Sequence, residues 1–83
     1  MLDFEGLVRI ERTRQDDKWG EQNHNPQVWL SILMEEVGEL ASATLFSMSG
    51  IKKHPDKKIG NEIIQIAAVC KAMWESGERN RWV

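Results

Sequence analysis

The chain has 83 residues, of which 41% are hydrophobic, and a formal net charge of −2 with a pI near 5.6. This length fits one domain, residues 1–83, whose core would be thin in a monomer, so we expect self-association. The acidic balance argues against a nucleic-acid-binding protein, which would carry a basic face, and no apolar run is long enough to span a bilayer. A single cysteine, Cys70, excludes an intramolecular disulfide framework. Together with the lack of a charged leader followed by an apolar run, it predicts a cytoplasmic location.

The first predicted element is a helix from about Leu2 to Asp17. Its apolar stripe is narrow, and Gly20 is expected to end it. A polar loop follows over residues 20–25. No segment alternates apolar and polar residues with the period of two that a strand requires, so the expected fold is all-α.

The second predicted helix begins at Asn25 and Pro26, an N-cap residue followed by proline at the first helical position, and extends to Gly50. Its apolar side chains point in nearly every direction around the axis. We therefore expect this helix to be central, with some of its sides covered by a second subunit. The three-helix chain would then complete a four-helix-type bundle by homo-oligomerisation, as a homodimer or a dimer of dimers.

The third predicted helix follows a basic loop, is capped by Asp56 and stops at Gly77. Its expected apolar stripe, at spacings of four and three, consists of Ile59, Ile63, Ile66, Cys70 and Met73. Cys70 is thus expected to be a small core residue. The basic residues of the loop indicate either a solvated segment or a lid that faces a phosphate; they are Lys52, Lys53, Lys57 and Lys58.

Several glutamates fall inside the predicted apolar arcs. Glu36 and Glu39 lie three residues apart on one face of the second helix, and Glu62 lies in the packed stripe of the third, with Gln65 at its margin. Glu35 falls in the polar sector of the second helix. A carboxylate removed from water costs several kcal/mol unless a cation or hydrogen-bond donors compensate it, so the cluster predicts a bound cation. Oxygen ligands favour Mg²⁺, with Mn²⁺ as an alternative.

The pattern Glu35-Glu36-Val37-Gly38-Glu39 followed by Glu62-Ile63-Ile64-Gln65 resembles the paired signature of the MazG-like, all-α nucleoside triphosphate pyrophosphohydrolases. That signature has Glu-Glu-x-x-Glu on one helix and Glu-x-x-Asp on the next. The flanking residues are similar to those of the small, phage-type members: Gln15, Lys18-Trp19-Gly20, Gln22 and His24 upstream, and Ala67-Ala68-Val69 and Trp74 downstream. The resemblance covers most of the chain.

The resemblance implies hydrolysis of a nucleoside triphosphate, NTP or dNTP, to the monophosphate and pyrophosphate, with Mg²⁺ held by the acidic helices of a bundle that a second subunit completes. Glu36, Glu39 and Glu62 match metal-ligand positions. Gln65 stands where the fuller pattern has Asp, and an amide oxygen can ligate Mg²⁺ without adding charge. Glu35, at the rim, is the candidate base that accepts the proton of the attacking water. The candidate substrate-binding residues are Lys18, Trp19 and His24.

Ordinary alternatives remain for these residues. His24 also fits a surface residue, and tryptophans more often fill cores or interfaces than stack on bases. For the whole chain, the alternative to the hydrolase is a non-catalytic helical interaction module with a degenerate metal site. Gln65 and the short length favour this module, whereas the three glutamates inside apolar arcs favour the enzyme.

Overall fold

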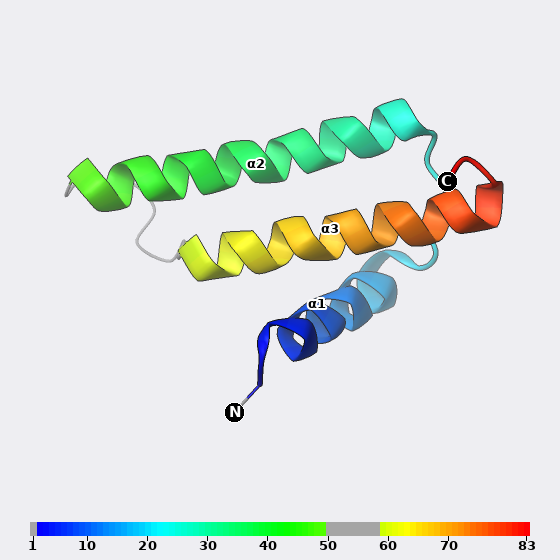
Figure 1. The fold of residues 1–83 in the computed structure, drawn as a ribbon, viewed down its shortest axis with the longest axis horizontal. Coiled ribbons are helices and arrows are strands. Elements are labelled where there is room, and N and C mark those ends of the chain that lie inside the picture. Colours follow the sequence, from blue (N-terminus) through cyan, green and yellow to red (C-terminus); the bar gives the residue numbers. More distant parts are fainter. Residues whose placement is uncertain (1, 50–58) are drawn as a thin grey trace.

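The computed structural model describes residues 2–49 and 59–83, with side chains for 2–45 and 59–83. Within these ranges the fold is all-α, as predicted, and consists of α1 (Phe4–Trp19), α2 (Pro26–Ser49) and α3 (Ile59–Asn80) (Figure 1). The predicted Asp56 cap, the lysine-rich loop and the predicted end of α2 at Gly50 lie outside the described residues.

Side chains and glycine set the first three helix ends. The Asp3 carboxylate accepts a hydrogen bond from the Gly6 N–H at 2.9 Å, which places the start of α1 slightly later than predicted. Gly20, with φ of 70°, ends α1, and its N–H donates to the Asp16 carbonyl at 2.8 Å. The predicted Asn25 cap of α2 is confirmed, since its Oδ1 accepts from the backbone N–H two residues after Pro26 at 2.9 Å.

The predicted end of α3 at Gly77 is wrong. The helix continues to Asn80, and Arg81, with φ of 61°, reverses the chain so that the Trp82 N–H donates to the Gly77 carbonyl at 3.0 Å. A Cβ built on Gly77 would lie 2.6 Å from Cγ1 of Val83. Glycine is therefore needed at this position because the chain end packs directly over it, and not because the helix stops there.

In the single chain α3, and not α2, is the central helix. It contacts both neighbours, whereas no Cα atom of α1 lies within 8 Å of a Cα atom of α2 in the described chain. Figure 1 shows α2 and α3 running antiparallel, with α1 on the other side of α3. The core lies between α2 and the carboxyl-terminal half of α3, where Trp29, Val69 and Ala72 are buried and Trp82 packs against them.

The buried face of α3 also differs from the predicted stripe. Its buried residues are Glu62, Ala68, Val69, Ala72, Ser76 and Gly77. Cys70, predicted to be in the core, is exposed, as are Ile59 and Ile63. Because α3 packs against helices on two sides, its small residues let the backbones approach closely, while of the predicted stripe Met73 packs against the core and Ile66 is partly buried.

One side of α2 is uncovered. Its large apolar residues between 37% and 64% exposed are Val28, Leu30, Met34, Val37 and Leu45. The radius of gyration is 14.0 Å, against about 12 Å for a compact chain of this length. The accessible surface is 6023 Å², against roughly 5,100 Å² for a compact monomer of this mass. No helix in the described residues is both long and apolar enough to cross a membrane.

Candidate functional site

All three helices border a polar cleft of about 840 Å³, within the range of roughly 300–1,000 Å³ typical of ligand sites. The described residues that line it are Arg14 and Trp19 of α1; Glu35, Glu36, Gly38, Glu39 and Ser42 of α2; and Asn61, Glu62 and Gln65 of α3. The antiparallel packing of α2 and α3 brings the two halves of the acidic pattern, separated by more than twenty residues, to one place. The cleft thus gathers all the acidic residues singled out in the sequence, together with Gln65 and Trp19.

The glutamates of α2 differ in exposure. Glu36 and Glu39 are partly buried, as expected from their places inside the apolar arc, whereas Glu35 is exposed at the rim, as predicted. Since residues three apart share a helical face, Glu36 and Glu39 lie on the side of α2 that borders the cleft. Glu36 and Glu39 therefore form part of one wall of the cleft.

Glu62 is the most unusual residue of the opposite wall. It is only 8% exposed, lines the cleft, and has no hydrogen bond or ion pair with any other described residue. Buried carboxylates are normally paired, because burial removes water without replacing it. A cation in the cleft would supply the compensation that the described residues do not provide.

A hard divalent cation fits these donors only in part. Among the described residues, no three His, Cys, Asp or Glu side chains stand close enough to hold one ion together. Mg²⁺, however, keeps several waters and is commonly bound through one or two carboxylates plus the phosphates of a substrate. The oxygen-only donor set of Glu36, Glu39, Glu62 and Gln65 suits such a partly hydrated ion.

The α1 wall carries one predicted residue and one that the sequence reasoning missed. The predicted residue, Trp19, is 52% exposed and has the ammonium of Lys18 at 4.7 Å from its ring centroid, a cation–π contact. Lys18 itself is not among the described residues that line the cleft. The missed residue is Arg14, whose hydrogen bonds to Glu11, and the charge of that carboxylate, raise the pKa of its guanidinium. Its spacing of four residues from Lys18, on the same face of a helix, was the available signal.

His24 lies outside the cleft lining. Its ring meets that of Trp29 edge to face, with centroids 5.0 Å apart and planes at 71°. Trp29 is buried, and its Nε1 has no hydrogen-bond partner in the described part of the chain. His24 therefore lies beside the core, and the described structure does not bring it together with the acidic residues.

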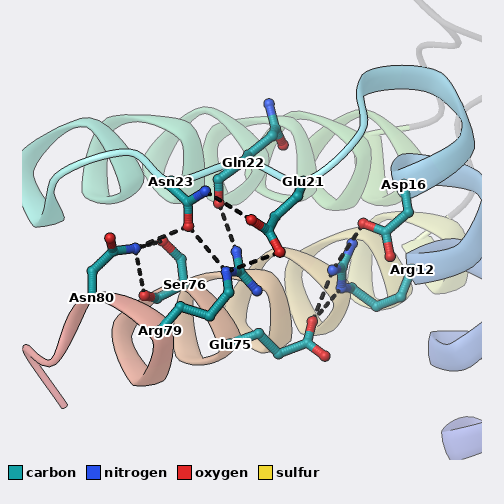
Figure 2. Close-up of polar contacts among 9 residues, drawn as sticks. All are labelled: Arg12, Asp16, Glu21, Gln22, Asn23, Glu75, Ser76, Arg79 and Asn80. Atoms are coloured by element: carbon teal, nitrogen blue, oxygen red, sulfur yellow. Dashed lines mark hydrogen bonds and ion pairs between the residues drawn. The ribbon is translucent and has the colours of Figure 1, made fainter.

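Polar contacts anchor the loop that holds His24 to the end of α3 (Figure 2). Arg79 donates from Nη2 to the Gln22 carbonyl at 2.9 Å and from Nε to Asn23 Oδ1 at 3.0 Å, and it pairs with Glu21 at 3.3 Å. Asn80 donates to the same Asn23 oxygen at 2.9 Å. Because this loop joins α1 to α2, the contacts fix where both cleft-lining helices meet.

A second set of contacts joins α1 to α3. Arg12 donates from Nε and Nη2 to one carboxylate oxygen of Glu75, at 3.1 and 2.8 Å, and also pairs with Asp16 at 3.1 Å (Figure 2). The Arg12 side chain is mostly buried, so this pair is less screened by solvent than an exposed one. It holds α1 against α3 and so sets the position of the α1 wall of the cleft.

In comparisons with known proteins, no family model, no curated protein and no solved structure matches this chain. The resemblance to the MazG-like pyrophosphohydrolases accordingly rests on the sequence pattern alone.

Proposed function

We propose that the protein is a Mg²⁺-dependent nucleoside triphosphate pyrophosphohydrolase, whose active site is the cleft between the three helices. The observation that carries the proposal is Glu62: a nearly buried carboxylate, without a partner in the described chain, that lines a ligand-sized cleft opposite Glu36 and Glu39. Even a partial desolvation cost at this carboxylate, about 1 kcal/mol, is a noticeable fraction of the stability of so small a domain. The retention of Glu62 is explained if a cation occupies the cleft during function.

The residues around the cleft suit separate tasks. Glu36, Glu39 and Glu62 would hold the ion, with the Gln65 amide oxygen as a neutral ligand. The ion, when bound, would neutralise charge on the phosphate oxygens and favour ionisation of water near neutral pH. Glu35, exposed at the rim, would accept a proton from the attacking water.

Trp19 provides an aromatic surface for the nucleobase. Lys18 contacts the Trp19 ring through a cation–π interaction. This contact orders the Trp19 side chain before a nucleobase stacks on it. The proposed products are the nucleoside monophosphate and pyrophosphate, since the resemblance implies attack between the α- and β-phosphates.

We also propose that the active form is a homodimer or a dimer of dimers. The single chain exposes about 900 Å² more surface than expected for its mass. A typical stable interface buries about 800 Å² on each partner. The exposed apolar residues of α2, among them Leu30 and Met34, are the natural interface because neither α1 nor α3 of the same chain covers them.

A non-catalytic interaction module is the second candidate. The same uncovered side of α2 favours it, and so does the lack of a three-residue metal group among the described residues. The two candidates differ in the residues that they require. The enzyme needs the carboxylates of the cleft, whereas the module needs only the apolar side of α2.

The deciding experiment is a panel of NTPs and dNTPs with Mg²⁺, scored for release of pyrophosphate and of orthophosphate. Glu62→Gln should remove the activity, since it keeps the size of the side chain but removes the charge. Glu78→Gln, on an exposed position of the same helix, is the matched control and should be active. Orthophosphate as the sole product, or no hydrolysis of any nucleotide, would refute the proposal, and in the second case retained self-association would favour the module.

A further inference from the structure

Arg14 is the only basic residue among the described residues that line the cleft. It lies on α1, across from the glutamates of α2 and α3, which carry four negative charges between them. A polyphosphate that enters an acidic cleft is repelled by the carboxylates except where cations face it. Besides a metal ion, the described cleft offers such a cation only at Arg14.

Only some of the N–H groups of the Arg14 guanidinium donate hydrogen bonds to other described residues. Nε and Nη2 donate to the two carboxylate oxygens of Glu11, at 2.9 and 2.6 Å. A guanidinium has five N–H groups in a rigid planar fork. About three of them, including both on Nη1, have no acceptor among the described residues, and the side chain is 50% exposed. This free edge of the fork is the part that can take two oxygens of one phosphate group.

Glu11, in contrast, is mostly buried and is fixed by another side chain of α1. Its side chain is only 12% exposed, and Oε2 accepts a further contact from the Gln15 amide at 3.4 Å. The Gln15 side chain in turn accepts from Arg12 at 3.1 Å, and Arg12 is bound to Glu75 of α3. A chain of polar contacts therefore runs from α3 through α1 to Arg14 and limits the directions in which the guanidinium can point.

We infer that Arg14 binds the pyrophosphate part of the nucleotide and that Glu11 is its positioning residue; the inference rests on the proposed function of the cleft. The terminal phosphates carry most of the negative charge of a nucleoside triphosphate, so they gain most from a planar cation. The alternative is a simple helix-stabilising pair at i, i+3, which contributes only a few tenths of a kcal/mol. If Arg14 and Glu11 formed only such a pair, its removal would leave ligand binding unchanged.

Calorimetry with inorganic pyrophosphate and Mg²⁺ tests the assignment without turnover. Arg14→Gln should weaken pyrophosphate binding roughly ten- to a hundredfold, the loss expected for hydrogen bonds to a charged group. Arg14→Lys should recover only part of this loss, because an ammonium cannot present two donors in one plane. Binding of a nucleoside monophosphate should change less than twofold in both variants.

Glu11→Gln tests the positioning role. It removes the charge that fixes the guanidinium but leaves Arg14 in place, so we expect the Michaelis constant to rise about three- to tenfold while kcat changes little. Arg9→Gln, an exposed arginine of the same helix outside the cleft, is the control and should behave as the parent protein. The thermal midpoint of each variant, measured beside it, separates loss of contact from loss of fold.

The outcomes separate this inference from the proposed function. If the parent protein releases pyrophosphate from a nucleotide and Arg14→Gln binds pyrophosphate as tightly as the parent, only the role of Arg14 is refuted. A selective loss of monophosphate binding in Arg14→Gln would overturn the assignment to the terminal phosphates. A parent protein that hydrolyses no nucleotide refutes the proposed function, whatever Arg14 binds.

Discussion

Replacing Glu62 with Gln should have opposite effects on the metal-free and the metal-bound protein. Glu62 is 8% exposed as a residue and has no partner among the described residues, but its side chain lines a cleft that is open to water. Its desolvation cost is therefore well below the several kcal/mol of a fully buried ion, and we take about 1 kcal/mol. Since 1 kcal/mol shifts the thermal midpoint of a domain this small by about 4–8 °C, the metal-free variant should melt higher than the parent by that amount.

With Mg²⁺ the order should reverse. An ion that binds only the folded state at a hundred times its dissociation constant adds about 2.7 kcal/mol, so the parent midpoint should rise by more than 10 °C. Glu62→Gln should lose most of this rise, because one ligand and one charge are missing from the site. Differential scanning fluorimetry at constant protein concentration, with chelator or with millimolar Mg²⁺, measures both effects.

The control for this experiment is Glu78→Gln, which should follow the parent protein in both conditions. A parent midpoint that does not respond to Mg²⁺ would contradict the cation site. A metal-free Glu62→Gln less stable than the parent would contradict the desolvation argument, since it would mean that the carboxylate already has a stabilising partner.

Three further predictions concern assembly, packing and the substituted ligand. Leu30→Glu should convert the oligomer to a monomer in light scattering, because it places a charge on the uncovered side of α2; a compact parent monomer at micromolar concentration would refute the proposed interface. Gly77→Ala should lower stability by about 1–3 kcal/mol in denaturant titration, since its Cβ would meet Val83, whereas Gly60→Ala, with open space around it, should be neutral or stabilising. Gln65→Asp should tighten Mg²⁺ binding in calorimetry by adding a charged ligand, and an unchanged affinity would place Gln65 outside the ion's coordination shell.

The sequence was sufficient for features that depend on local chemistry. The Asn25 cap and the Gly20 end of α1 were predicted because each follows from the hydrogen-bond needs of a few adjacent residues. The gathering of Glu36, Glu39 and Glu62 on one cleft followed from helical periodicity, once α2 and α3 were assumed to pack together. The two helix ends required no knowledge of how the helices pack, and the cluster required only that α2 and α3 be neighbours.

Features that depend on which helix lies between the others were not predicted. Hydrophobic periodicity gives weight to large side chains, and so it selected the Ile63 and Cys70 face of α3, although the contacts are made by small residues such as Ala68 and Ala72. Arg14 was missed for a similar reason. Its role depends on a cleft formed by residues distant in the sequence, and its spacing of four residues from Lys18 is by itself common on solvated helices.

The separation between the backbones of α1 and α2 in the described chain affects how the cleft would respond to a ligand. The width of the cleft depends on how both helices rest on α3 and on the loop that joins them. A molecule that touches Trp19 on one wall and Glu36 on the other would add a link between these two helices to the one that the loop over residues 20–25 provides. Part of its binding free energy would then be used to reduce their relative motion, so ligands too short to reach both walls would bind without making the helix pair more rigid.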